Sequence, residues 1–231
     1  RVEARLKAGK AFVSCGDDET LNQPSPVSGV VGTTPMPAAT HVACASVGGR
    51  ILTVERNDLD RGLPGVGAFR SAMETLHQLN LVDAIREVAA RGTPLLGICL
   101  GMQLLLDASE EFGVTQGLGL IPGNVVAIPS VTTSGESQKI PHIGWNMLDL
   151  PAGREDWRAT LLEDNTVGDA AYFVHSFMAM PADPVHRVAD ANYGGHAISA
   201  VIARDNIAGC QFHPEKSGEV GLKILRRFCF G

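Results

Sequence analysis

The chain has 231 residues, a net charge of −6 and 45% hydrophobic residues, values that suit one globular domain with a full core. No apolar run reaches the roughly 18 residues of a membrane span and no basic patch indicates nucleic-acid binding, so we expect neither a membrane nor a nucleic-acid partner. The five cysteines are odd in number and follow no metal-binding spacing, which favours a reducing, cytoplasmic compartment and argues for no metal.

The first stretch with an unusual pattern is residues 20–49, which contain no Asp, Glu, Lys or Arg. Pro, Gly, Ser, Thr, Ala and Val dominate it, and no helical stripe is visible. Structureless loops of this length are uncommon inside compact domains. The next element is a helix predicted over residues 71–90 and ended by Gly92, with Leu81, Ala84, Ile85 and Val88 as its core stripe.

Residues 94–106 carry the most informative pattern of the chain. An apolar strand over 94–98 leads to Cys99, which Gly97 and Gly101 flank, and a helix over 102–108 follows. This is the G-x-C-x-G form of a nucleophile elbow, in which the glycines leave room for a tight bend and the helix N-terminus favours the thiolate. A lone cysteine before a Leu-rich helix is more often a buried core residue, so the prediction depends on a partner elsewhere.

The elements after the elbow complete an α/β pattern. The predicted elements are a strand over 124–128, an exposed polar loop over 129–138, a strand over 170–177, two strands over 197–203 and 207–212 joined by a turn, and a helix over 218–228 that Ser217 is placed to cap. Strands that alternate with helices around a βα elbow predict a three-layer α/β sandwich.

His213 and Glu215 are the partners that the elbow needs. Residues i and i+2 of an extended segment point the same way, so Glu215 can reach the ring of His213. A cysteine nucleophile requires a base, and the base requires a group that orients its ring. Cys210, three residues before His213, faces the opposite way and is interpreted as a packing residue.

These motifs together resemble the class I (triad) glutamine amidotransferases, and within them the glutaminase subunits of imidazole glycerol phosphate synthases. The resemblance runs from Leu63 to the C-terminus and includes six segments in the family's order, at 63–69, 97–106, 117–123, 139–146, 172–177 and 212–218. It implies a flavodoxin-like three-layer sandwich with a central, mostly parallel sheet.

The resemblance implies glutamine hydrolysis without a cofactor. Cys99 would attack the side-chain amide, His213 would move the proton and Glu215 would orient His213. The oxyanion hole would combine the backbone N–H of Leu100, which follows the nucleophile, with the loop of Val66 and Gly67.

Several further residues match the family's glutamine pocket. They are Gly65, Gln103, Tyr172, His175 and Ser176, and Gln103 lies one helical turn beyond the nucleophile. His175 fits a structural role at the end of a strand equally well.

A partner subunit is also implied by the resemblance. Trp145, Asn146 and Lys216 match the face that docks a separate cyclase subunit, giving a heterodimer in which ammonia is channelled to the cyclase. The cyclase would make imidazole glycerol phosphate and AICAR in histidine biosynthesis.

Residues 1–61 depart from the family pattern, although we expect residues 1–231 to form one amidotransferase domain. The expected opening strand, the Asp-Tyr-Gly turn and the following Gly-Asn and helix are absent from them. We therefore expect this segment to be disordered or foreign to the family, as a reading-frame error recovered just before Leu63 would make it. A divergent N-terminus is the alternative, and a targeting peptide fits less well because of Asp17, Asp18 and Glu19.

Three other functions stay open at this point. A sibling amidotransferase could supply ammonia to a surface-sugar synthase, since its motifs overlap. The chain could be a non-catalytic binding subunit if residues 1–61 prevented a working fold. A cysteine hydrolase of other amides is disfavoured by the matches at Gln103 and 172–176.

Overall fold

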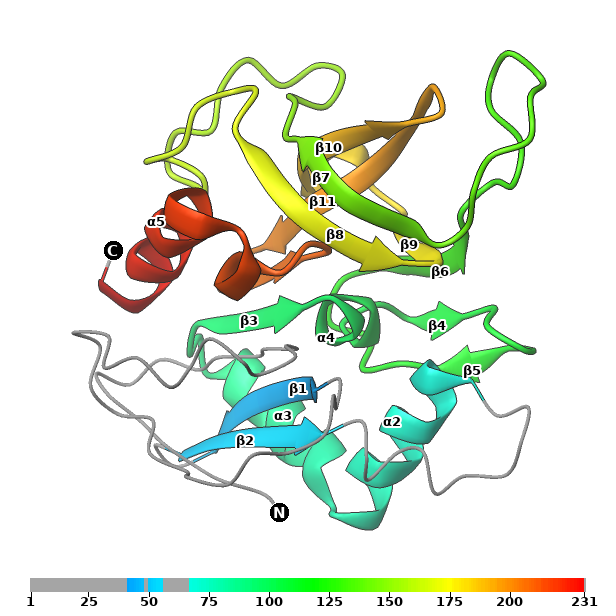
Figure 1. Cartoon of the computed structure of the whole chain (residues 1–231). Helices are drawn as coiled ribbons and strands as arrows, with labels where there is room; N and C mark the ends of the chain where they lie inside the picture. The colour runs from blue at the N-terminus through cyan, green and yellow to red at the C-terminus, as the bar shows by residue number, and fades with distance from the viewer. Residues whose placement is uncertain (1–40, 48–49, 56–66, 231) are drawn as a thin grey trace, which may run out of the picture.

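The computed structural model describes residues 41–47, 50–55 and 67–230 (Figure 1). The helices in these ranges are α2 (Ala68–Gln78), α3 (Leu81–Ala90), α4 (Leu100–Leu104) and α5 (Gly218–Phe230), with 3-10 turns η1 (Pro184–His186) and η2 (Pro214–Lys216). The strands are β1 (His41–Val47), β2 (Arg50–Glu55), β3 (Leu95–Ile98), β4 (Ala108–Ser109), β5 (Thr115–Gln116), β6 (Gly123–Ala127), β7 (His142–Met147), β8 (Ala170–His175), β9 (Phe177–Pro181), β10 (Arg187–Tyr193), β11 (His196–Arg204) and β12 (Ile207–Cys210).

The described strands form mixed sheets. One sheet has the order β10-β11-β12-β3 and a second the order β5-β4-β6-β9, while β7 pairs with β8 and β1 with β2. Parallel pairing joins β12 to β3 and β4 to β6, and the other described pairs are antiparallel. Antiparallel pairing dominates here because short turns connect β10 to β11 and β11 to β12, whereas parallel neighbours need long crossovers. The α/β class is confirmed.

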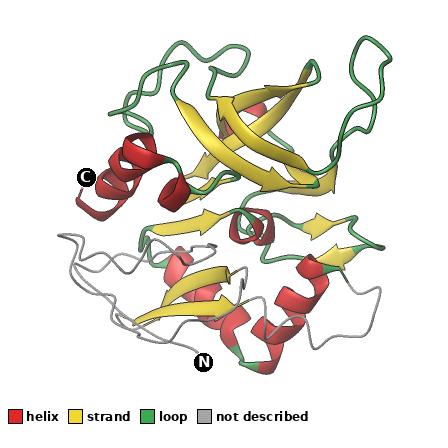
Figure 2. Cartoon of the chain, in the orientation of Figure 1, coloured by secondary structure: helices red, strands yellow, loops and turns green. Residues whose placement is uncertain are grey.

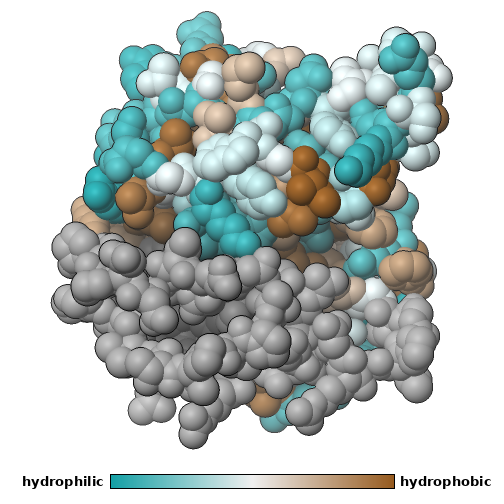
Figure 3. All heavy atoms as spheres, viewed as in Figure 1, coloured by the Kyte–Doolittle hydropathy of each residue, from teal (hydrophilic) through white to brown (hydrophobic). Residues whose placement is uncertain are grey.

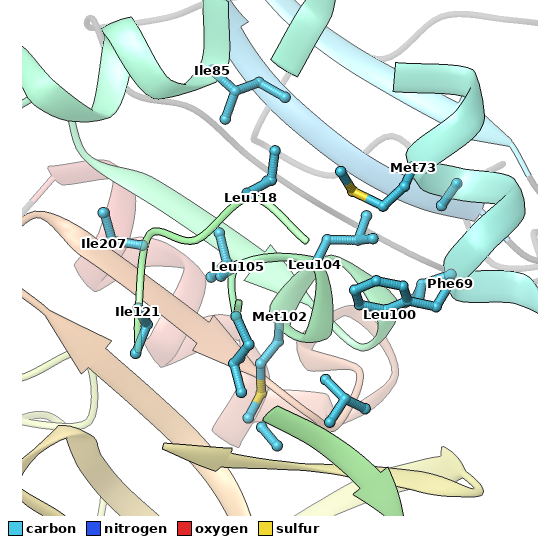
Figure 4. Close-up of a cluster of buried hydrophobic side chains, with 14 of the residues drawn as sticks. Phe69, Met73, Ile85, Leu100, Met102, Leu104, Leu105, Leu118, Ile121 and Ile207 are labelled. Carbon is cyan, nitrogen blue, oxygen red and sulfur yellow. The ribbon is translucent and has the colours of Figure 1, made fainter. Parts of the chain in front are cut away.

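Two hydrophobic cores lie on the two faces of the sheet that contains β3. Leu95 packs in the core formed with α2, α3 and α4, whereas Leu96 and Ile98 pack in the core formed with β8, β10 and α5. Figure 4 shows the first of these cores. This division follows from the two-residue period of a strand. Helices therefore cover the sheet from both sides (Figure 2), which confirms the predicted three layers and buries all four residues of β3.

The elbow region keeps its predicted order with a shorter helix. The strand predicted over 94–98 is β3, but α4 begins at Leu100 and ends at Leu104 instead of spanning 102–108. The chain leaves the helix early because Ala108 and Ser109 pair with β6 as strand β4. The sharp turn at Cys99 therefore leads into little more than one turn of helix.

The single helix predicted over 71–90 is two helices, and that prediction was wrong. Asn80 lies between α2 and α3 in the left-handed region, at φ 55° and ψ 37°. Asn is one of the few residues that adopts this conformation at modest cost, so the chain changes direction there. Ile85 and Val88 are buried as predicted, while Leu81 and Ala84 are half-buried.

Six of the described strands were not predicted, namely β1, β2, β4, β5, β7 and β10, and one predicted strand is divided. The segment 170–177 breaks at Ser176 into the end of β8 and the start of β9. The strands β7 and β10 are additional elements, and β10 pairs with β11 at the edge of its sheet. The loop over 129–138 is largely exposed, as expected.

The atypical segment 1–61 is described only over β1 and β2, which form an antiparallel hairpin. The strand β1 lies against β3, α3 and α4, on the same side of β3 as the first core (Figure 1). The expectation for the rest of this segment falls outside the described residues.

Candidate active site

Cys99 lies at the sharp turn between β3 and α4. Its backbone is at φ 52° and ψ −113°, a conformation that is strained for a residue with a side chain and that is typical of functional turns. Its N–H donates to the carbonyl of Cys210 at 2.7 Å, which fixes the turn to β12. At Gly97 a Cβ atom would come within 2.6 Å of the carbonyl oxygen of Gly101, so the bend requires glycine there.

His213 and Glu215 lie in the segment that follows β12. The Nδ1 atom of His213 is 2.7 Å from Oε1 of Glu215, and the His213 side chain is 1% exposed. Burial alone lowers the pKa of His213, but hydrogen bonds with Cys99 and Glu215 outweigh it and raise the pKa to about 10. The ring is then a cation at neutral pH, and a cation beside the Cys99 sulfur favours the nucleophilic thiolate.

Two hydrogen bonds through Tyr172 join β8 to the segment that contains His213. The N–H of His213 donates to the carbonyl of Tyr172 at 2.9 Å, and the N–H of Tyr172 donates to Oγ of Ser217 at 3.0 Å. The Ser217 hydroxyl itself donates to the carbonyl of His213 at 2.7 Å. Ser217 was predicted to cap α5, but the contacts of its hydroxyl are with Tyr172 and His213, and they fix the position of the base.

The carbonyl of Phe177 is the centre of a buried hydrogen-bond network behind the nucleophile. It accepts from Nδ1 of His175 at 2.8 Å and from Nε2 of Gln103 at 2.9 Å. Because a carbonyl only accepts, these two contacts set the tautomer of His175 and the orientation of the Gln103 amide.

One branch of the network runs from His175 to β7. With Nδ1 of His175 donating, its Nε2 accepts from Nδ1 of His142 at 3.1 Å. Nε2 of His142 then accepts from Nδ2 of Asn146 at 3.3 Å, and the same Nδ2 donates to the carbonyl of Asn192 at 2.8 Å. Burial, and then the neighbouring His175, lower the pKa of His142 to about 4; burial likewise lowers the pKa of His175, so both rings are neutral at pH 7.

The other branch runs from Gln103 back to the nucleophile. Nε2 of Gln103 also donates to Oε1 of Gln211 at 3.0 Å, and Nε2 of Gln211 donates to Sγ of Cys99 at 3.8 Å. Gln211 and His142 were both missed by the sequence analysis. A signal for Gln211 was present, because it stands two residues before His213 in an extended segment and so shares its face.

The structure divides the predicted pocket residues between two faces of β8. His175 lies on the buried face, and the Tyr172 ring lies on the other, in an edge-to-face contact with Trp145 at 6.1 Å between centroids. Ser176 is at the break between β8 and β9, where its carbonyl accepts from the N–H of Ile128 at 2.9 Å. Alternation along the strand separates Tyr172 from His175.

The predicted oxyanion loop is described only at its end. Gly67 precedes α2, and Gly65 and Val66 lie outside the described residues. The carboxylate of Glu111 accepts from the N–H of Phe69 at 2.8 Å and so holds the start of α2 beside this loop. Leu100 is the first residue of α4, where N–H groups have no partner within the helix.

The outer face of the β7–β8 hairpin is apolar and exposed. We define it by Ile143, Trp145 and Met147, which are 52–60% exposed and alternate along β7, with Tyr172 and Val174 opposite them on β8. Figure 3 shows apolar surface on the upper half of the molecule, which contains β7 and β8 in the view of Figure 1. The carbonyl of Val174 is 3.9 Å from Sγ of Cys99, so the backbone of β8 passes close to the nucleophile.

Two of the residues predicted for the partner interface, Trp145 and Asn146, lie on opposite sides of β7. Trp145 belongs to the outer face, but the Asn146 side chain points to the other side of β7, toward His142 and β10. Lys216 lies in η2, directly after Glu215. Alternation along β7 separates the two neighbours.

Cys210 packs in the second core as predicted and is fully buried. Burial, with the charge of Glu215 acting in the same direction, raises the pKa of its thiol far above the usual range, so this cysteine stays a neutral packing group. Within the described residues, no three His, Cys, Asp or Glu side chains gather as a metal site would require. None of the described helices combines the length and apolar character of a membrane span.

Comparison with known proteins identifies the family of this chain. The family model for "Glutamine amidotransferase class-I" matches residues 63–231, and the chain belongs to that family. A relative from Legionella pneumophila (strain Lens), "Imidazole glycerol phosphate synthase subunit HisH 1", is 55% identical over 72% of this chain and 78% of its own length. The HisH subunit of Geobacillus thermodenitrificans (strain NG80-2) is 50% identical over 72% of this chain and 75% of its own. A crystal structure of a glutamine amidotransferase superposes with a TM-score of 0.49 and 13% identity over 70% of this chain and 75% of that one.

Proposed function

We propose that this chain is the glutaminase subunit of an imidazole glycerol phosphate synthase. The observation that carries the proposal is the convergence of Cys99, His213 and Glu215, in which a charged imidazole lies beside a cysteine in a strained elbow. The names of its relatives favour this function over the surface-sugar alternative. The assembled site argues against a non-catalytic binding subunit.

In this proposal the reaction has two halves. Sγ of Cys99 attacks the side-chain carbonyl carbon of glutamine, and His213 gives its proton to the departing ammonia. A water molecule, deprotonated by His213, then hydrolyses the glutamyl thioester and releases glutamate. The N–H of Leu100, with the loop of Gly65, Val66 and Gly67, would stabilise the oxyanion in both halves.

The pocket residues position glutamine in this scheme. Gln103 and His175 share the Phe177 carbonyl, which keeps both side chains fixed beside the nucleophile. We assign substrate binding to them, to Gly65 and to Ser176. Tyr172, which contacts Trp145, is better placed to border the substrate entrance from the outer face.

The partner would be a separate cyclase subunit, in a cytoplasmic heterodimer. Exposed aromatic and aliphatic side chains on the outer face suit a protein interface, since such anchors dominate binding energy. The backbone of β8 passes close to the nucleophile at Val174, so a partner bound against this hairpin could receive ammonia released nearby. Lys216, directly after the triad, would lie at the rim of that contact. The cyclase would then use the ammonia to form imidazole glycerol phosphate and AICAR.

The test is an assay of glutamate formation from glutamine by the full chain, alone and with a cyclase subunit and its nucleotide substrate. We expect weak hydrolysis alone and strong stimulation by the complex. Cys99→Ala should abolish it, and Cys229→Ala, a substitution in α5, should leave it unchanged. Hydrolysis that survives Cys99→Ala in the complex would contradict the proposal.

A further inference from the structure

Gln211 is a fully buried polar residue to which the triad gives no role. It extends β12, where its N–H donates to the carbonyl of Ala200 at 2.8 Å, and its side chain is 0% exposed. A buried primary amide must satisfy both an acceptor oxygen and a donor nitrogen, because an unpaired polar group in the core is costly. Its two partners are Gln103 and Cys99.

The orientation of both amides follows from one fixed acceptor. The Phe177 carbonyl cannot donate, so the group of Gln103 that faces it at 2.9 Å must be the NH₂. The same NH₂ faces Gln211 at 3.0 Å, so that atom of Gln211 must be its oxygen. The NH₂ of Gln211 is then the group 3.8 Å from Sγ of Cys99, and no other assignment satisfies all three contacts.

These assignments define which hydrogen bonds the amides of Gln103 and Gln211 can make in the site. Both N–H groups of Gln103 are used inside the protein, so its amide can meet a substrate only as an acceptor. A donor such as the α-ammonium group of glutamine fits that oxygen. At the other end, an N–H that points at sulfur interacts more strongly with a thiolate than with a thiol, because hydrogen bonds to charged groups are the stronger ones.

We propose that Gln211 is a positioning residue of the glutaminase site, whose NH₂ supports the thiolate of Cys99 while its oxygen holds Gln103 ready to accept from the substrate. The inference rests on the proposed function and names a residue that acts on both the nucleophile and the pocket. It complements His213, since the imidazolium supplies charge and Gln211 supplies a neutral donor that does not titrate.

The test measures the reactivity of Cys99 without any turnover of glutamine. Iodoacetamide alkylation of the peptide that contains Cys99 would be followed by mass spectrometry from pH 5 to pH 9, in the full chain. Gln211→Met keeps the volume and removes both polar groups. Gln211→Asn stays polar but is one methylene shorter. Gln138→Met is the matched control, because Gln138 is a buried glutamine whose NH₂ donates to the carbonyl of Pro129.

We expect the midpoint of the alkylation profile to rise by about one pH unit in both Gln211 variants and to stay unchanged in the control. In the complex with the cyclase, KM for glutamine should rise several-fold in Gln211→Met, because Gln103 loses its partner. A wild-type midpoint in a folded Gln211 variant would overturn the inference, as would failure of both variants to fold, which would assign Gln211 a structural role. Absence of glutaminase activity in a wild-type chain with a reactive Cys99 would instead contradict the proposed function.

Discussion

Cys99 lies where three distant parts of the chain meet. The elbow supplies its strained backbone, the segment after β12 supplies His213 and Gln211, and the end of β8 supplies the carbonyl of Val174. The charge of this cluster depends on His213, whose pKa of about 10 results from hydrogen bonds with Cys99 and Glu215 that outweigh burial.

The first prediction concerns Glu215. Glu215→Gln keeps a hydrogen-bond acceptor but removes the negative charge, so the pKa of His213 should fall by about one to two units. Glutamine hydrolysis in the complex should fall by about tenfold or more. The titration of the His213 ring by NMR measures the pKa directly. Glu219→Gln, which changes an exposed carboxylate of α5, is the control and should move neither quantity.

The parts of the site that are formed by residues close together in the sequence were predictable. The elbow at Cys99 and the i, i+2 pair of His213 and Glu215 are patterns within a few residues of each other. Gln103 was found only through the family resemblance. Gln211 was missed although its place two residues before His213 was a signal, whereas His142 was missed because its role depends on a contact with His175 across the β7–β8 pair, which no local pattern predicts.

At the scale of elements, the pattern of side chains along β7 explains why this strand was not predicted. Its exposed positions are Ile143, Trp145 and Met147, while His142 and Asn146 face inward and are satisfied by hydrogen bonds. This inverts the usual rule that the apolar face of a strand is buried. The inversion is what we expect where the outer face meets a partner, as proposed, and the inner face carries a polar network.

The second prediction concerns the junction of α2 and α3. Asn80 is in the left-handed region, so Asn80→Gly should leave the free energy of unfolding unchanged or slightly raised. Asn80→Val should lower it by about 1–2 kcal/mol, because a β-branched residue is strained there. Urea unfolding measures both. Gln78→Val, at an exposed position with ordinary helical geometry, should cost only about 0.5 kcal/mol. Equal losses for the two valine variants would contradict this account of the break.

At the scale of the whole molecule, the fold is organised around two hydrophobic cores on opposite faces of one sheet. The three layers were predictable because β3, β12 and α5 have clear apolar patterns. The register of the mixed sheets was not, since it depends on short turns and on pairings between distant segments such as β12 with β3. No pattern in the charge-free segment 20–49, which contains β1, predicted the hairpin of β1 and β2.

The third prediction concerns stability in acid. The pKa of His142 is lowered to about 4, so below about pH 6.5 the unfolded chain binds a proton that the folded chain does not. This contribution to stability is therefore complete above pH 6.5 and is lost as the pH falls toward 4. Between pH 7 and pH 5 the loss should be about 2 kcal/mol.

The measurement is urea unfolding at pH 7, 6 and 5. His142→Gln should be less stable at pH 7 but should lose about 2 kcal/mol less than the wild type over this range. His77→Gln, at an exposed histidine of α2, should follow the wild type. A His142→Gln variant with the wild-type pH dependence would show that this ring is not held neutral by burial.

The central claim is that Cys99 is a nucleophile selective for glutamine. The most direct measurement exposes the full chain, in complex with a cyclase subunit, to a glutamine analogue that carries an electrophilic diazoketone, and locates the adduct by mass spectrometry. We predict one adduct, on Cys99 among the five cysteines, which excess glutamine prevents and which His213→Ala greatly slows. An adduct on another cysteine, or a Cys99 adduct that glutamine does not prevent, would contradict the account.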